Sequence, residues 1–142
     1  MDRSIIKVYN PYNCFLIGQN KILHHAVLSA LGLRSPVSVL VRDMDSIKSI
    51  IKNRTLEFPV LLKPNAGGYG KGIQKFKCKE ELLKFCRENT HIDRNIFGMD
   101  GSALIQHCYG SSQSPDVYRV WLLNGSLQCA IKVERPRGGF SG

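Results

Sequence analysis

The sequence predicts a mixed α+β fold. Three observations support this prediction: helical and extended segments are interspersed along the 142 residues, a glycine-rich loop joins two short extended segments, and an Asn-Gly pair joins two more. Apolar residues spaced three and four apart indicate helices, and short β-branched runs indicate strands. The composition, 43% hydrophobic and 22% charged, is that of an ordinary globular domain.

The first elements follow from local signals. Residues 4–10 are expected to be extended and to stop at Pro11. A helix should begin at Gln19 or Asn20 and end at Gly32, because its apolar residues recur at helical spacing. The β-branched residues 36–41 should form a strand.

The next helix is expected over residues 43–53, because an Asp capping signal precedes an apolar face. The later strands are expected at 58–63, 72–76, 101–109, 116–123 and 127–133, with a helix at 79–88. Asn124-Gly125 is the strongest short hairpin signal and should join the last two strands. Residues 109–116 should form a hinge between two lobes.

The formal net charge is +9, yet the basic residues are scattered, with no run of five or more. Phosphates of a small molecule or an acidic protein substrate would both suit this charge, and solubility alone would also explain it. We do not expect nucleic acid as a partner, because aromatic residues make up only 8% and are not clustered.

The chain lacks an apolar run of membrane-spanning length and a secretory signal, so a cytoplasmic protein without membrane contact is expected. Its five cysteines have no CxxC spacing, which indicates reduced thiols. We expect no metal ligands within these residues, because the histidines and cysteines do not combine into a zinc pattern.

The stretch "KPNAGGYGKGI" at residues 63–73 places glycines and lysines directly after an apolar strand. A Walker loop is excluded, because Asn65 and Gly72 stand where that motif needs Gly and Ser or Thr. The dinucleotide fingerprint is excluded by its spacing and by the extended segment that follows. The third possibility is a glycine-rich flap, which joins two antiparallel strands and folds over a triphosphate. Protein kinases use such a loop, but their catalytic-loop and metal-binding motifs are absent from this sequence.

Four stretches, in order, resemble the nucleotide-binding part of ATP-grasp proteins: "NPYNCFLIGQNKILHHAVLSALGLRSPVSVLV", "FPVLLKPNAGGYGKGI", "ALIQHCY" and "DVYRVWLLNGSLQCAIKVERP". The branch they resemble most contains glutathione synthetase and the RimK-like ribosomal-protein glutamate ligases. The resemblance spans roughly residues 8–137. It implies an ATP-grasp fold of two α+β lobes with ATP between them. Residues 1–110 would form the N-terminal lobe and residues 111–142 the start of an incomplete C-terminal lobe.

The resemblance also implies nucleotide contacts. Lys63 would contact phosphate, and Lys21 would be a second phosphate lysine, although an ordinary first-turn helix lysine is the alternative. The flap residues would be Gly67, Gly68, Tyr69, Gly70, Lys71 and Gly72. Lys71 would either touch phosphate or keep the flap soluble. The adenine hinge, which can act through its backbone, would be Gln106, His107, Cys108 and Tyr109.

Further positions follow from the same resemblance. Asp116 lies near the position of the family's ribose-binding acid, and relatives usually carry Glu where this chain has His107. Arg119 matches a strand arginine, and Arg135 falls where basic residues face substrate or the γ-phosphate, with a solvated strand end as its alternative. Arg119 and Arg135 are the candidate catalytic residues.

The implied activity is ATP-dependent ligation of a carboxylate to an amine through an acyl phosphate, with Mg²⁺ as cofactor. The substrates are an unknown carboxylate and amine, for example an acidic peptide or protein. After Asp116 the only acidic residue is Glu134. The metal ligands are therefore expected beyond residue 142, and this chain would be a fragment of a longer protein. The alternative is a nucleotide-binding module without catalysis.

We therefore predict that the 142-residue chain alone does not form amide bonds. Without bridging Mg²⁺, the charge that develops during phosphoryl transfer is not neutralised. A phosphate-release assay with pools of carboxylates and amines measures this. Substrate-dependent release that Lys63→Ala abolishes would contradict the prediction.

Overall fold

The computed structural model describes residues 10–68, 70–89, 96–98, 100–109 and 117–133. The chain divides into two compact units, residues 1–108 and 109–142, and each is described by itself. The assignment of residues 1–110 and 111–142 to two lobes that enclose ATP stays a prediction.

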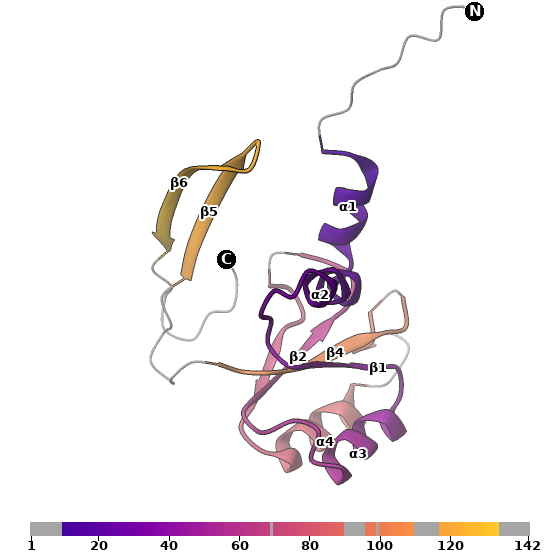
Figure 1. Ribbon diagram of the computed structural model, residues 1–142. Helices are drawn as coiled ribbons and strands as arrows, with labels where there is room; N and C mark the ends of the chain where they lie inside the picture. The colour runs from indigo at the N-terminus through magenta and orange to yellow at the C-terminus, as the bar shows by residue number, and fades with distance from the viewer. Residues whose placement is uncertain (1–9, 69, 90–95, 99, 110–116, 134–142) are drawn as a thin grey trace, which may run out of the picture. The chain divides into compact units, whose positions relative to one another are not determined.

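The first unit is built on a four-stranded antiparallel sheet (Figure 1). Its strand order is β1-β4-β2-β3, so β4 and β2 lie at the centre. The strands are β1 (Ser38–Val41), β4 (Ala103–His107), β2 (Val60–Pro64) and β3 (Gln74–Phe76). Each lies within the segment predicted from the sequence or extends one residue past it. The mixed α+β prediction is confirmed.

Two helices cover one face of this sheet, α3 (Met44–Lys52) and α4 (Lys79–Glu88) (Figure 1). Side chains alternate between the faces of a strand, and on β2 this alternation sends Val60 and Leu62 into the core. The core is completed from the helices, the other strands and the connecting segments by Val41, Ile47, Ile50, Leu56, Phe76, Leu82, Cys86, Ile96, Phe97, Ala103 and Ile105. This apolar layer holds β2 rigidly, which positions the residue after Leu62.

The opposite face of the sheet lies under α2 (Lys21–Ala30) (Figure 1). On this face the register places Leu61 opposite Gln106 and Lys63 opposite Leu104. The residues that follow the same alternation on the other strands include Ser38 and Lys75. The sheet therefore has an apolar face under α3 and α4 and a partly polar face under α2.

Local signals explain where the helices begin. Asn20 precedes α2, and its side chain accepts a hydrogen bond from the backbone N–H of Leu23 at 2.8 Å. Asp43 precedes α3 and forms a reciprocal capping box with Ser46, with bonds of 2.7 and 3.2 Å. The predicted starts of both helices are confirmed.

Helix α1 (Tyr12–Gln19) was not predicted from the sequence. None of its residues is buried, and Tyr12 and Phe15 are exposed, so its apolar residues show no stripe that packs on a core. Pro11 immediately precedes the helix, a place where its missing N–H costs no helical hydrogen bond. The extended piece predicted for residues 4–10 falls, apart from Asn10, outside the described residues.

The second unit contains one antiparallel hairpin, β5 (Val117–Leu123) and β6 (Ser126–Val133). Asn124 and Gly125 join the strands with φ of 50° and 76°, as the Asn-Gly signal predicted. Residues 118–132 are all exposed, including Trp121. All five cysteines are free thiols. Among the described residues, the helices are too short or too polar to cross a membrane.

We predict fast amide hydrogen exchange in residues 117–133 and slow exchange in residues 60–63. A lone two-stranded hairpin with exposed faces is marginal in water, whereas β2 is paired on both sides. Exchange measured by mass spectrometry on the purified monomer decides this. Equal, strong protection of both segments would contradict the prediction.

Candidate functional site

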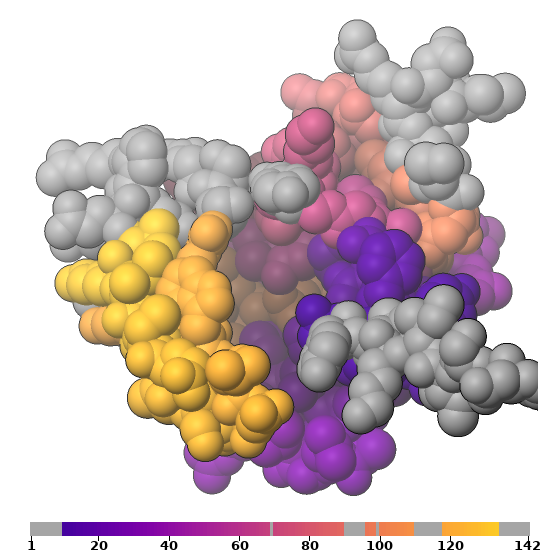
Figure 2. Space-filling view, turned by 90° about the horizontal axis from the view of Figure 1, so that it is seen from above, coloured from indigo at the N-terminus to yellow at the C-terminus, as the bar shows by residue number. Residues whose placement is uncertain are grey.

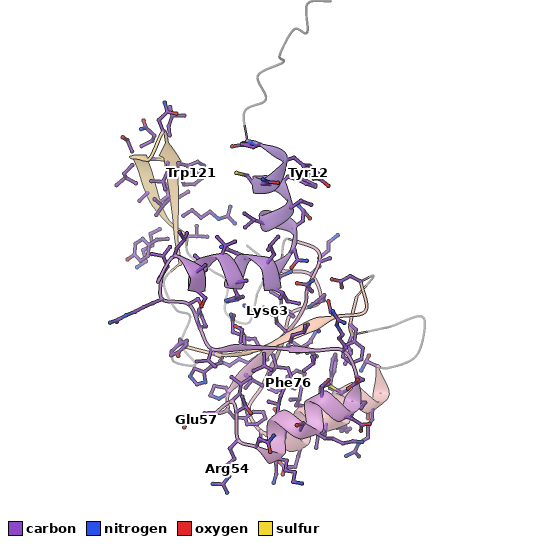
Figure 3. The ribbon with its side chains drawn as sticks, turned by 45° about the vertical axis from the view of Figure 1, so that its right-hand side comes forward. Tyr12, Arg54, Glu57, Lys63, Phe76 and Trp121 are labelled. Atoms are coloured by element: carbon purple, nitrogen blue, oxygen red, sulfur yellow. The ribbon has the colours of Figure 1, made fainter. Side chains whose placement is uncertain are left out.

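Lys63 is the centre of the candidate site. It lies near the end of β2, half-buried between the sheet and α2 (Figure 3). Its ammonium donates a hydrogen bond to Oε1 of Gln106, and within the described residues it forms no ion pair. Burial lowers the pKa of Lys63, the positive charge of Lys21 lowers it further, and Cys108 opposes this shift. The cation is therefore held near a neutral amide instead of a carboxylate.

The side-chain amide of Gln106 connects Lys63 to His25 of α2. An ammonium only donates hydrogen bonds, so the amide oxygen of Gln106 must face Lys63 and the amide nitrogen must face away. That nitrogen lies 2.8 Å from Oγ of Ser38 and 3.0 Å from Nε2 of His25. Nε2 of His25 therefore accepts, which places the ring proton on Nδ1.

This arrangement keeps His25 neutral. Burial lowers the pKa of His25, and the charges of His24 and Lys63 lower it further. Its Nδ1 is buried and has no hydrogen-bond partner among the described residues. The sequence patterns had not indicated His25 or Ser38, because neither belongs to a glycine loop or to the hinge stretch.

Lys21 lies at the first turn of α2, and its ammonium points to the base of the glycine loop. It donates to the backbone oxygens of Pro64, Asn65 and Gly67 at 2.8, 3.2 and 3.1 Å. Burial lowers the pKa of Lys21, and the negative charge of Asp100 opposes this shift. All three ammonium protons thus have backbone acceptors in this structure. Its predicted contact with phosphate stays a prediction.

Asn65 joins three segments at the start of the loop. Asn65 is buried and only 2% exposed. Oδ1 accepts from the N–H of Ile22 at 3.0 Å, and Nδ2 donates to Oδ2 of Asp100 at 2.5 Å. Its backbone oxygen accepts from the N–H of Lys21 at 3.2 Å, and its N–H donates to the oxygen of Ser102 at 3.1 Å. Figure 2 shows the start of α2 against this loop.

Asp100 completes this connection. Its Oδ2 also accepts from the hydroxyl of Ser102 at 2.9 Å. Burial raises the pKa of Asp100, but hydrogen bonds from Asn65 and Ser102 outweigh it, and the net pKa is lowered. The sequence patterns missed both Asn65 and Asp100. A polar residue directly after Lys63-Pro64 was the available signal for Asn65, and no local signal marked its distant partner.

The glycine loop needs its glycines at particular positions. Gly67, Gly70 and Gly72 have φ of 108°, 71° and 74°, a region that side chains disfavour. A Cβ on Gly72 would also lie 2.8 Å from Cγ of Pro64, so the two ends of the loop approach closely. Gly68 has no such constraint, Lys71 is exposed, and Tyr69 lies outside the described residues.

Gln106 and His107, the two predicted hinge residues that belong to β4, lie on opposite faces of the strand. Gln106 faces Lys63, whereas the next side chain, His107, faces the opposite way, and its Nδ1 lies 2.9 Å from the backbone oxygen of Glu57. The N–H groups of His107 and Cys108 donate to the oxygens of Val37 and Pro59, each at 2.9 Å. An adenine that paired with either N–H would have to replace a bond of the sheet. Tyr109 is exposed.

The remaining candidates lie in the second unit or outside the described residues. Arg119 lies on β5, opposite Ile131, in the second unit. Asp116 and Arg135 lie outside the described residues. In the described part of the chain, no group of three His, Cys, Asp or Glu side chains could hold a metal ion.

Known proteins are similar to this chain in sequence and in fold. Vancomycin C-type resistance protein VanC2 of Enterococcus casseliflavus is 36% identical over 91 residues, covering 57% of this chain and 25% of that protein. Coenzyme gamma-F420-2:alpha-L-glutamate ligase of Methanococcus maripaludis is 28% identical over 80 residues, covering 56% and 28%. The structure of D-alanyl-alanine synthetase A of Vibrio cholerae has a TM-score of 0.61 at 17% identity, covering 87% and 36%.

These similarities define the class of protein. The fold is that of ATP-grasp ligases. The family model of the RimK-like ATP-grasp domain matches residues 18–141, so the chain belongs to that family, as the sequence resemblance implied. ATP-grasp ligases use ATP and Mg²⁺ to join a carboxylate to an amine. The chain spans about a quarter to a third of the length of these relatives.

We predict that Asn65→Asp loosens the glycine loop and that adding Asp100→Asn restores it. The single change places two carboxylates together, which should cost about 1–3 kcal/mol of stability. In the double variant the new carboxylate at position 65 still accepts from the N–H of Ile22, and the new amide at position 100 donates to that carboxylate. Hydrogen exchange of residues 66–72 and the melting temperature report the effect.

The matched control is Asn53→Asp, which adds the same charge at an exposed position. It should leave exchange in the loop unchanged. A double variant no better than Asn65→Asp would show that the hydrogen bond between Asn65 and Asp100 does not hold the loop.

Proposed function

We propose that this chain binds ATP on the α2 face of the sheet, with Lys63 at the phosphates and the glycine loop folded over them. The observation that carries the proposal is the pairing of Lys63 with a neutral amide, while burial and the nearby positive charge of Lys21 lower its pKa. A phosphate would relieve this repulsion and would form a charge-assisted hydrogen bond with Lys63.

The loop supports the same assignment. Successive backbone N–H groups beside lysine suit phosphate oxygens. Some N–H groups of the loop are used internally: Lys71 donates to the oxygen of Gly68 at 3.2 Å and Ile73 to that of Gly70 at 3.3 Å. These hydrogen bonds shape the loop, and Lys21 and Asn65 hold its first residues in place. Because the glycines carry no side chains, the loop backbone can approach phosphate oxygens closely.

The whole protein would be an ATP-dependent carboxylate–amine ligase. The γ-phosphoryl group of ATP would pass to a carboxylate oxygen, which gives an acyl phosphate and ADP. An amine would then attack the carbonyl carbon, expel inorganic phosphate and form the amide. Lys63 would bind and orient the phosphates. Arg119 and Arg135 would stabilise the negative charge that develops at the transferred γ-phosphoryl group.

We further propose an acidic peptide or protein as the carboxylate substrate. The formal net charge of +9 supports this proposal. Titration with an oligoglutamate peptide tests it, and binding should weaken as salt rises. An affinity no greater than that for an uncharged peptide of the same length would count against an acidic substrate.

We predict that Lys63→Ala lowers the affinity for ATP about 10- to 100-fold. Loss of a charge-assisted hydrogen bond to phosphate costs about 1.5–3 kcal/mol. Calorimetric titration of the folded wild type and variant measures the change. Lys84→Ala, which replaces an exposed lysine of α4, is the control and should bind like the wild type. Equal affinities of the wild type and Lys63→Ala would remove Lys63 from the site.

A further inference from the structure

A pocket lies on the α3 and α4 side of the sheet, on the face opposite to the proposed ATP site. It is enclosed by the end of α3, the segment 54–60, α4 and strands β2 and β4, and its volume is about 400 Å³. Val60 and Ile105 form its sheet side, and both point away from the face that carries Lys63 and Gln106. Pockets for small ligands typically have about 300–1,000 Å³.

The floor of this pocket is apolar. Leu56, Val60, Leu82 and Ile105 line it and are each at most 8% exposed. These side chains can bury a hydrocarbon chain or ring and offer it no hydrogen bond. The floor therefore selects an apolar group of modest size.

The charged residues that line the pocket are all cations: Lys52, Arg54 and Lys79. Lys79 lies 3.8 Å from Glu80, a pair in which both side chains are well exposed, and Lys52 and Arg54 form no ion pair within the described residues. Glu80 and Glu81 stand in the first turn of α4 but do not line the pocket. The lining thus combines an apolar floor with three positive charges, of which only Lys79 has an acidic partner among the described residues.

Arg54 adds a second observation. It has a φ of 49° and lies two residues after the end of α3, where its N–H donates to the oxygen of Ile51 at 3.3 Å and the N–H of Thr55 donates to the oxygen of Ile50 at 3.2 Å. Glycine is the usual residue at this left-handed position. A strained residue kept at a pocket suggests a role for its side chain. Figure 3 shows Arg54 reaching outward from the segment between α3 and β2.

We propose that this pocket binds a small amphipathic anion of the medium-chain carboxylate class. The hydrocarbon part would lie on Leu56, Leu82 and Ile105, and the carboxylate would meet the lysines and the arginine at the rim. The site is separate from the proposed nucleotide site, so either proposal can fail without the other.

The test is a titration of the full 142-residue chain with octanoate, followed by NMR of isoleucine and leucine methyl groups. The expected result is saturable shifts at Ile50, Leu82 and Ile105. Octanol, with the same chain and no charge, should bind more weakly, and octylamine should not bind. The double variant Lys52→Gln and Arg54→Gln should weaken octanoate roughly 2- to 30-fold, the range for two exposed charge pairs.

The control is Lys48→Gln with Lys84→Gln, which removes two charges from the same helix layer outside the pocket. It should bind octanoate like the wild type, and thermal melts should confirm that both variants fold. Absence of saturable shifts, equal binding of octanoate and octanol, or equal weakening by the control variant would each overturn the proposal.

Discussion

The buried amide of Asn65 is the contact on which the candidate site depends. Its side chain both donates and accepts, so it joins the start of α2 to the loop that carries Asp100. With the loop base held there, Lys21 reaches three backbone oxygens, and Lys63 stays beside Gln106. An aliphatic side chain at position 65 would leave the N–H of Ile22 without its side-chain acceptor and Asp100 without its bond from Asn65. The position of Lys21 therefore depends on this amide, whereas Lys63 is placed by β2 and its pairing with β4.

The alternation of side chains along β2 and β4 gives the sheet one apolar face and one polar face. Val60, Leu62 and Ile105 form the hydrophobic core with α3 and α4, while Lys63 and Gln106, each next in sequence to a core position, form a polar face under α2. The core side is packed, so the polar side does not have to supply stability and can hold uncompensated charge. The pocket beside Leu82 lies where the packed side is incomplete.

Much of the fold could be predicted from the sequence because its signals are local. The Asp43 cap, the Asn124-Gly125 turn and the β-branched runs are each contained within a few residues, and the structure shows the elements they predict. Helix α1 lacks a buried stripe, so its pattern was uninformative. Lys63 was recognisable because a lysine that ends an apolar strand needs a partner.

The rest of the site depends on contacts between residues far apart in the chain. Asn65 and Asp100 are 35 residues apart, and His25 and Gln106 are 81 apart. No periodicity or spacing rule links such residues. Which of Gln106 and His107 faces Lys63 is set by the register of β4 against β2, and a shift of one residue would have exchanged them. Strand register is a property of the folded sheet, and it decides which hinge side chain can meet a ligand.

The strand order also determines when the first unit can fold during synthesis. β4 is the last strand of this sheet in the chain, yet it lies between β1 and β2. Until residue 107 has left the ribosome, β1 has no neighbour, and β2 can pair only with β3. The hydrogen bond between Ser38 and Gln106 joins residues 68 positions apart. A loop of that length must close before this contact forms. The nascent chain therefore exposes the strand edges that β4 will cover, and the polar face with Lys63 is assembled in the last step.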